Sequence, residues 1–202
     1  MDLLCVGHGR TAWNADNRFQ GHTDIPLDDE GRAQATALEP LLRDERIDVA
    51  VASDLARAAE TARLVLGPRG LPVRLDAEWR EMRFGDWEGR TWDEIVAANP
   101  HLPRGSETSV KDYTPGGGET FAELCVRVAG AVERVVAETP GDGVALVATH
   151  AGPLHALLEV LLGESERAAL QVRFLTASIT RFRRTNGVWT LARLNQTARV
   201  AT

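Results

Sequence analysis

Two histidines follow apolar runs near opposite ends of this 202-residue chain. His8 stands between two glycines after the apolar run at 3–6, and His150 follows the β-branched run at 144–148. A histidine at the end of a buried strand is held on a rigid base and stays open to a ligand, as in many phosphate and nucleotide sites. The two imidazoles can meet if both strands are central in one sheet.

The first glycines also match the dinucleotide fingerprint G-x-G-x-x-A, at residues 7–12. That fingerprint requires a helix directly after it, then a second strand that ends in an acidic residue about 20 positions on. The residues that follow are polar and turn-rich, and the next strand pattern begins only at Asp48. The sequence therefore argues against a dinucleotide site.

Composition sets the bounds for the rest of the chain. With 44% hydrophobic residues, 202 residues can bury a full core as one domain, 1–202. The net charge of −6 and the isoelectric point near 5.4 argue against a general partner of nucleic acids or anionic membranes. No signal-peptide pattern or apolar run of membrane-spanning length is present, so we expect a cytoplasmic protein with Cys5 and Cys125 as small core residues. The sequence leaves the oligomeric state open, a homodimer included.

Strand and helix patterns alternate along the chain. Besides the two runs above, strands are predicted at 48–52 and 72–75, and a hairpin over 178–194 turns at Asn186 and Gly187. Helices are predicted at 28–43, with a kink or an early end near Glu39 before Pro40, at 54–66 with Ser53 as its cap, from Thr91, at 119–138 and at 152–162. This order predicts a three-layer α/β/α sandwich with a mostly parallel sheet and an antiparallel C-terminal edge.

Several blocks of the chain, in order, resemble those of the histidine phosphatase superfamily, the phosphoglycerate-mutase-like enzymes. The blocks are GHGRTAWN at 7–14, RFQGHTDIPL at 18–27, SDLARAAETA at 53–62, EMRFGDWEG at 81–89, PGGGE at 115–119 and THAG at 149–152. The resemblance covers nearly the whole chain and implies the fold predicted above, with no cofactor and no metal.

The resemblance also implies roles that agree with the residue types. Phosphoryl transfer through histidine needs a neutral imidazole, cations and N–H donors around the phosphate, and an acid for the leaving oxygen. These roles would fall to His8 as nucleophile, Arg57 as phosphate clamp, His150 as second histidine and Glu81 as proton donor. A carboxyl group beside a phosphate has a raised pKa, which suits an acid near neutral pH.

Further donors around the phosphate are expected from the loops that carry these blocks. They are Gly9, Arg10, Asn14, Gln20, Gly21, Thr23 and Ala151. The remaining histidines, His22, His101 and His155, are expected to be structural, and His155 lies among leucines of a predicted helix.

The chain departs from the family pattern at two positions. Gly7 replaces the arginine that precedes the nucleophilic histidine, and Arg10 stands where the family often has glutamate. Loss of one charge-assisted phosphate contact costs about 1.5 to 3 kcal/mol. Two hypotheses follow: Gly7 weakens the enzyme, which Gly7→Arg would correct, or Arg10 supplies the missing guanidinium.

A phosphomonoesterase that hydrolyses a small phosphorylated metabolite is the function that the resemblance implies. Mutases of the family usually carry an insertion that covers the site, and the stretch 91–116 is short here. The alternatives are a phosphoglycerate-type mutase and an impaired relative that only binds phosphate esters. Residues near the entrance are expected to include Arg104, Glu107 and Lys111.

Overall fold

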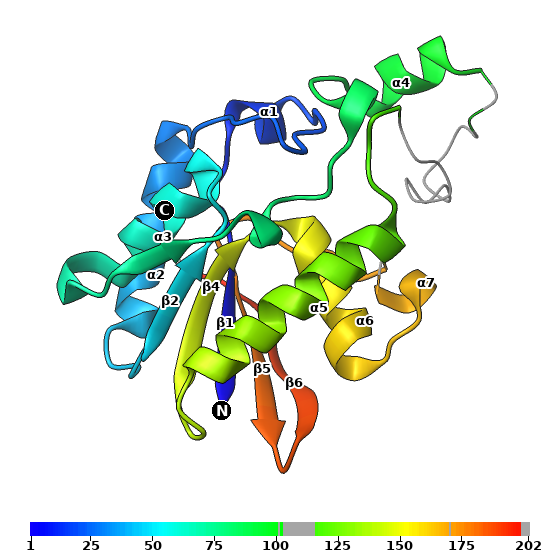
Figure 1. The fold of residues 1–202 in the computed structure, drawn as a ribbon. Helices are drawn as coiled ribbons and strands as arrows, with labels where there is room; N and C mark the ends of the chain where they lie inside the picture. Colours follow the sequence, from blue (N-terminus) through cyan, green and yellow to red (C-terminus); the bar gives the residue numbers. More distant parts are fainter. Residues whose placement is uncertain (101, 103–115, 170, 199–202) are drawn as a thin grey trace.

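The computed structural model describes residues 1–100, 102, 116–169 and 171–198. Its centre is a six-stranded sheet in the order β3-β2-β4-β1-β5-β6 (Figure 1). The four strands β1 (Asp2–Gly7), β2 (Val49–Ala52), β3 (Val73–Leu75) and β4 (Val144–Thr149) run parallel. The hairpin strands β5 (Ile179–Thr185) and β6 (Val188–Gln196) close one edge in the antiparallel sense. The predicted sheet is confirmed.

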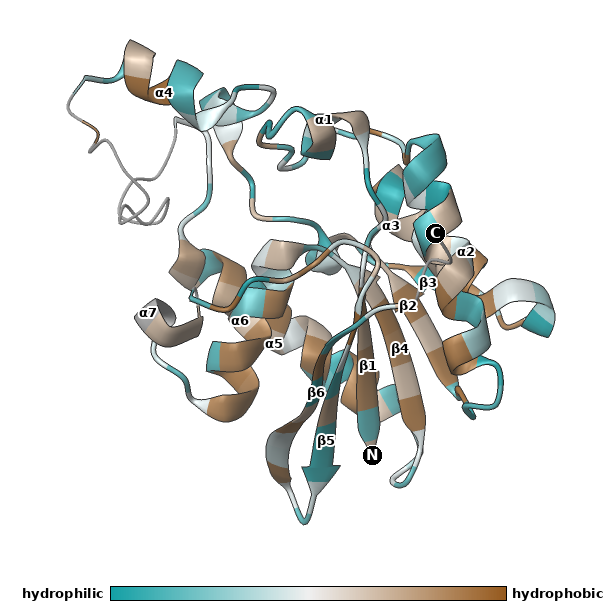
Figure 2. Ribbon diagram, turned by 180° about the vertical axis from the view of Figure 1, so that it is seen from behind, coloured by the Kyte–Doolittle hydropathy of each residue, from teal (hydrophilic) through white to brown (hydrophobic). Residues whose placement is uncertain are grey.

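Helices cover both faces of the sheet, which confirms the three-layer architecture (Figures 1 and 2). One layer holds α2 (Asp29–Leu42) and α3 (Ala56–Leu66), and the other holds α5 (Phe121–Glu138) and α6 (Ala151–Leu162). Strand side chains alternate between the layers: Leu3 packs with α5 and α6, and Leu4 packs with α2 and α3. Both faces of β1 are therefore buried, as its continuous apolar sequence indicates.

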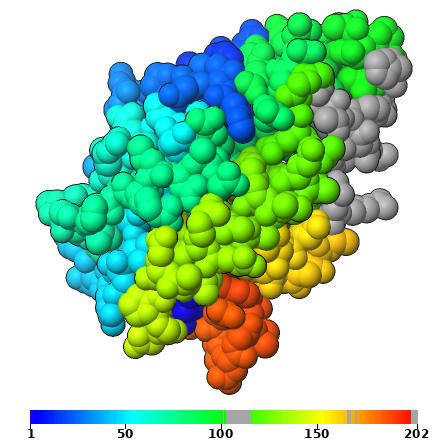
Figure 3. Space-filling view, in the orientation of Figure 1, coloured from blue at the N-terminus to red at the C-terminus, as the bar shows by residue number. Residues whose placement is uncertain are grey.

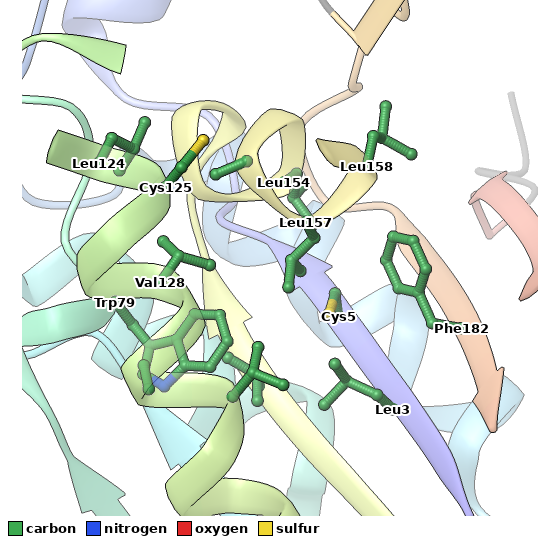
Figure 4. Packing of buried hydrophobic residues seen from close by; sticks show 14 of the residues in the cluster. Leu3, Cys5, Trp79, Leu124, Cys125, Val128, Leu154, Leu157, Leu158 and Phe182 are labelled. Atoms are coloured by element: carbon green, nitrogen blue, oxygen red, sulfur yellow. The ribbon is translucent and has the colours of Figure 1, made fainter. Parts of the chain in front are cut away.

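The core under α5 and α6 contains both cysteines (Figure 4). Cys5 lies on β1 and Cys125 on α5, both buried as free thiols, beside the fully buried Trp79. Their predicted role as small core residues is confirmed. In the part of the chain that the structure describes, no helix is long and apolar enough to cross a bilayer.

Two predicted helix ends are corrected. Ser53 is not the cap of α3, because the helix begins only at Ala56 and Leu55 takes the cap position without a side-chain bond. The Ala56 N–H donates to Asp24 Oδ1 (2.7 Å). A carboxylate from a distant loop thus replaces the local cap. The helix α2 does not end at Glu39 but continues through Pro40 to Leu42.

Other local predictions are confirmed. Thr91 and Glu94 form a capping box at α4 (Trp92–Ala98), and the hairpin turns through Asn186 and Gly187, both with positive φ. The longest helix begins at Phe121 rather than at 119, after a Thr120 capping box. Shorter helical segments are α1 (Ala12–Ala15), α7 (Glu166–Ala169) and the 3₁₀ turns η1 (Gly67–Arg69), η2 (Ala77–Trp79) and η3 (Gly85–Trp87).

The segment that carries α4 lies above the carboxyl ends of the parallel strands, next to the segment of α1 (Figures 1 and 3). A separate aromatic cluster joins residues of these two segments. Trp87 and Trp92 pack edge to face with ring centroids 5.9 Å apart. Phe19 and Phe84 pack against the same cluster, with centroids 5.0 Å apart. The loops beside the strand ends therefore have a small core of their own, which fixes their position over this end of the sheet.

Candidate active site

His8 follows directly on β1, and its backbone N–H donates to the Thr149 carbonyl oxygen of β4 (3.1 Å). Its ring Nδ1 lies 2.7 Å from the Gly9 carbonyl oxygen. Since a carbonyl oxygen only accepts, Nδ1 carries the proton and Nε2 carries the lone pair. Gly9 must lack a side chain here, because a Cβ would lie 2.3 Å from the Gly31 carbonyl oxygen of α2.

The imidazole of His8 is neutral. Burial is the main cause, since only 7% of the residue is exposed, and the positive charge of Arg57 adds to it. Together they lower the pKa of His8 to about 3. A neutral ring with a free Nε2 lone pair is the form that can attack phosphorus.

His150 follows β4 in the same way and takes the cap position of α6. Its ring centroid lies 5.1 Å from that of His8, so the sheet brings the two predicted histidines together. Its Nδ1 accepts a hydrogen bond from Nε of Arg57 (3.2 Å), so Nε2 carries the proton. That Nε2 is buried and has no protein partner among the described residues. Burial, followed by the charge of Arg57, holds the pKa of His150 well below its usual value.

Arg57 is fully buried in the first turn of α3. Besides Nε, its two terminal nitrogens donate to the carbonyl oxygens of Thr23 (2.9 Å) and Gly21 (2.8 Å). Burial lowers the pKa of Arg57, but a guanidinium still keeps its charge. One cation therefore joins the loop at 21–23 to His150.

Glu81 is buried beside the first turn of α6. Its Oε1 accepts from the backbone N–H groups of Met82 (2.7 Å) and Gly152 (2.8 Å). Gly152 permits this approach, because a Cβ there would lie 2.2 Å from Oε1. Burial raises the pKa of Glu81, although these two N–H groups and Arg57 oppose the shift. With Oε1 engaged as an acceptor, a proton on this carboxyl group would sit on Oε2.

The segment that carries Glu81 is held by groups that the sequence analysis missed. Arg127 of α5 pairs with Glu119 (2.6 Å) and donates to the carbonyl oxygens of Glu78, Arg80 and Glu81. An arginine among the apolar positions of the 119–138 helix was the available signal. His22, expected to be structural, places Nε2 2.9 Å from the Glu81 carbonyl oxygen.

A cleft of about 220 Å³ opens at this end of the sheet. Of the predicted residues, it is lined by His8, Asn14, Gln20, Glu81 and Ala151, while His150 and Arg57 lie behind them. The other lining residues were not predicted as site residues, although some of them stand in the family blocks. They are Gly7, Arg18, Phe19, Phe84, Leu154, Phe174, Leu175 and Thr176.

Two amide side chains, those of Asn14 and Gln20, line this cleft with their acceptor oxygens already engaged. Thr11 occupies the acceptor oxygens: its N–H donates to Asn14 Oδ1 (3.0 Å) and its hydroxyl to Gln20 Oε1 (3.1 Å). The amide nitrogens of Asn14 and Gln20 are therefore left to donate to a ligand in the cleft.

Four predicted phosphate ligands, Gly9, Arg10, Gly21 and Thr23, do not line the cleft. The Gly9 N–H donates to Thr61 Oγ1 (3.1 Å). The Arg10 guanidinium turns away to Asp28 (2.8 Å) and Glu30 (2.5 Å). The Thr23 hydroxyl donates to Glu88 Oε2 (2.5 Å), and Gly21 contributes its carbonyl oxygen to Arg57. The structure therefore does not bring Arg10 to the position left empty by Gly7. The predicted entrance residues Arg104, Glu107 and Lys111, and also His101, lie outside the described residues.

The described residues contain no group of three or more His, Cys, Asp or Glu side chains that could hold a metal ion. The cleft offers a neutral nucleophilic nitrogen, amide donors and a carboxylic acid, and a second histidine N–H and a buried cation lie behind its lining residues. This set matches the needs of phosphoryl transfer through histidine.

Comparison with known proteins decides the family. The sequence profile of the histidine phosphatase superfamily (branch 1) matches residues 3–197. This chain belongs to that superfamily. Phosphoglycerate mutase-like protein 4 of Arabidopsis thaliana is 32% identical over 94% of this chain and 83% of its own length. Adenosylcobalamin/alpha-ribazole phosphatase of Escherichia coli is 33% identical, over 97% of this chain and 91% of the relative.

Solved structures of the superfamily share the fold throughout. The mycobacterial glucosyl-3-phosphoglycerate phosphatase in complex with VO3 is 31% identical and superposes with a TM-score of 0.88, covering 97% of this chain and 99% of that one. Members of this superfamily thus include phosphatases and phosphoglycerate mutase-like proteins, and this chain shares their fold.

Proposed function

We propose that this protein hydrolyses a small phosphomonoester through a phosphohistidine on His8. The observation that carries the proposal is the state of the His8 ring, whose protonated Nδ1 bonds the Gly9 carbonyl oxygen 2.7 Å away. Its Nε2 lone pair is thereby fixed in a cleft that also holds Glu81 and the amide groups of Asn14 and Gln20.

In the first step, His8 Nε2 forms a bond to phosphorus as the bond to the ester oxygen breaks. The Glu81 proton passes to that oxygen, so the alcohol leaves neutral. The His150 Nε2–H group, backed by Arg57, stabilises the charge on the phosphoryl oxygens. In the second step, water attacks phosphorus, its proton passes to Glu81, and inorganic phosphate leaves as the P–N bond breaks.

Hydrolysis is favoured over the mutase reaction and over simple binding. Two of the relatives above are phosphatases by name. The proposed acid and nucleophile line the same cleft, which a passive binding site would not require. The reaction draws on protein groups alone, so we expect it to be independent of divalent metal ions.

Phosphate release from a panel of phosphomonoesters, with and without EDTA, tests the proposal. We expect turnover that EDTA leaves intact, and an acid-labile phosphoryl label on the peptide that contains His8 after quenching in alkali. The His8→Ala protein should lose both label and turnover. Turnover that EDTA abolishes and a divalent ion restores, or near-native activity of His8→Ala, would exclude the mechanism.

A further inference from the structure

The residues 174–176 form one wall of the cleft, immediately beside Gly7. A Cβ at Gly7 would lie 3.0 Å from the Leu175 carbonyl oxygen, which is closer than Cβ contacts normally come. The wall therefore takes the space where a side chain at position 7 would begin. Phe174 and Leu175 bring apolar surface to a place beside the nucleophile.

Hydrogen bonds hold this wall in place. Asn195 of β6 donates from Nδ2 to the Arg173 carbonyl oxygen (2.6 Å) and accepts from the Leu175 N–H (3.1 Å). The Ser178 hydroxyl donates to the Leu175 carbonyl oxygen (2.8 Å), and Ala177 N–H donates to the His8 carbonyl oxygen (2.9 Å). The wall is thus fixed relative to His8 before any ligand binds.

His155 orients the aromatic ring of the wall. Its Nε2 lies 2.7 Å from the Val172 carbonyl oxygen, and its ring packs edge to face on Phe174 with centroids 5.0 Å apart. The histidine was expected to be structural from sequence, and its structural task is to support this wall.

Phe19 and Phe84 line the same cleft from the loops on the side of α4, and Leu154 of α6 lines it as well. The two phenylalanine rings meet edge to face, 69° apart, and are packed against the aromatic cluster of Trp87 and Trp92. A leaving group that extends from the phosphate therefore meets fixed apolar surface from three parts of the chain.

Arg18 is the basic residue among the described lining residues, and its charge is already engaged. Its Nη1 donates to the Gly89 carbonyl oxygen (2.7 Å) and to Glu94 Oε2 (2.9 Å). A second anionic group on a substrate would have to compete with Glu94. The charge distribution of the cleft thus favours an uncharged leaving group.

Resting on the proposed hydrolysis, we propose that the preferred substrates are monoesters of apolar alcohols. Phe174 and Leu175 on one wall, with Phe84 from the loop on the side of α4, bind the apolar part of the alcohol next to the ester oxygen. Asn195 and His155 are positioning residues for Phe174. Apolar alcohols gain from burial in such a slot, whereas a polyol would lose hydrogen bonds to water without replacement.

Three esters of primary alcohols test whether the cleft prefers an apolar alcohol to a small alcohol or a polyol. They are phenethyl phosphate, ethyl phosphate and glycerol phosphate esterified at a primary hydroxyl. We expect phenethyl phosphate to have a kcat/KM about tenfold to a hundredfold above both others, the discrimination that one buried apolar group supplies. Equal values, or a preference for glycerol phosphate, would overturn the apolar slot and leave the proposed hydrolysis standing. Absence of phosphate release from all three and from the wider panel would overturn both.

Variants test the named residues through the phenethyl-to-ethyl ratio, which is the kcat/KM for phenethyl phosphate divided by that for ethyl phosphate. Phe174→Ser should lower this ratio about tenfold, mainly through the KM for the aromatic ester. Asn195→Gly removes the side chain where the backbone φ is +51°, which glycine accepts without strain, and should also lower the ratio.

The matched control is Val126→Ser on the exposed side of α5, which should keep the parent ratio. A variant that merely loses folded protein lowers both rates together and leaves the ratio unchanged. A parent-like ratio in Phe174→Ser would show that this ring does not contact the leaving group, and the assignment of the wall would fall.

Discussion

Arg57 donates its Nε–H to Nδ1 of His150 (3.2 Å), and this bond gives His150 the tautomer opposite to that of His8. His150 carries its proton on Nε2, whereas His8 carries its proton on Nδ1, against the Gly9 carbonyl oxygen. One ring therefore offers a lone pair and the other offers an N–H. A nucleophile and a donor for phosphoryl oxygens arise from the same residue type through their hydrogen-bond partners alone.

The Arg57→Lys variant tests that relationship. Lysine cannot reach His150 and the carbonyl oxygens of Gly21 and Thr23 together, so at least one buried acceptor loses its donor. We expect kcat/KM to fall by about 10²- to 10³-fold, as for loss of one oxyanion donor, and unfolding free energy to fall by about 1 to 3 kcal/mol. Phosphate release and urea denaturation measure the two effects.

Arg63→Lys is the matched control, because Arg63 lies on the same helix and is exposed. It should keep both the activity and the stability of the parent. Near-native kcat/KM in Arg57→Lys would show that the buried guanidinium does not act on the phosphoryl group.

The pH dependence of kcat/KM should report Glu81. Burial raises the pKa of Glu81, and the residue acts as an acid only while it is protonated, so activity falls as the pH rises through this pKa. Glu81→Gln keeps an oxygen for the N–H groups of Met82 and Gly152 but has no proton to lose. On an alkyl phosphate we expect about a 10²- to 10⁴-fold loss of kcat/KM and the disappearance of this alkaline limb.

The same variant should lose less kcat/KM on p-nitrophenyl phosphate, whose leaving oxygen needs no proton, with a drop below about tenfold. The comparison is made in kcat/KM because this quantity reports the steps up to release of the alcohol and leaves out the later attack of water, in which Glu81 takes part for every ester. Comparison with the parent on each ester removes the titration of the substrate itself. Glu78→Gln, in the adjoining η2 turn, is the control and should keep the parent profile. Equal losses on both esters would mean that Glu81 supports the site without donating the proton.

The sequence predicts most of the fold because the strands carry clear apolar runs. Residues 3–6 and 144–148 are apolar throughout, and in the structure they are neighbouring parallel strands with helices on both faces. The error at Ser53 has a physical cause: Asp24, 32 residues away, supplies the cap of α3. A local pattern cannot show a cap that comes from another loop.

The residues of the site also divide into those that the local sequence marks and those that it does not. His8 and His150 are marked by strand ends and adjacent glycines, which are local signals. Arg127 and Asn195 act through carbonyl oxygens of segments 46 or more and 22 residues distant. The local sequence marks Arg127 as unusual on an apolar helix, but it does not show which segment either residue holds. Arg10 shows the reverse case, since its position in the motif predicts a phosphate contact and two nearby carboxylates hold it elsewhere.

The Arg10→Ala variant should therefore keep kcat/KM within about threefold of the parent, below the loss expected for a group that contacts the transition state. The side chain is held by Asp28 and Glu30, and it is partly exposed, so stability should change by less than about 1 kcal/mol. Arg32→Ala, which breaks an ion pair between α2 and Glu60 of α3, is the control for general charge loss. A loss of a hundredfold or more in Arg10→Ala alone would show that Arg10 moves to the phosphate during turnover.

An arginine at position 7 would bring both a charge and a steric conflict. The Leu175 carbonyl oxygen lies 3.0 Å from the position of a Cβ and is held by Ser178, so any side chain must displace a fixed wall. Gly7→Ala introduces only this conflict, and we expect it to lower unfolding free energy by about 1 to 3 kcal/mol and to lower kcat/KM. Urea denaturation and phosphate release measure the two losses.

Gly7→Arg has the same steric conflict as Gly7→Ala and adds a guanidinium. The kcat/KM of Gly7→Arg divided by that of Gly7→Ala therefore isolates the effect of the charge. We expect a ratio of about tenfold to a thousandfold, the value of one charged hydrogen-bonding group at a phosphoryl oxygen. The two variants should be assayed on ethyl phosphate, whose small alcohol makes little demand on the wall. A ratio near one would mean that a cation at position 7 cannot reach the phosphate in this cleft, and that Gly7 does not weaken the enzyme by removing one.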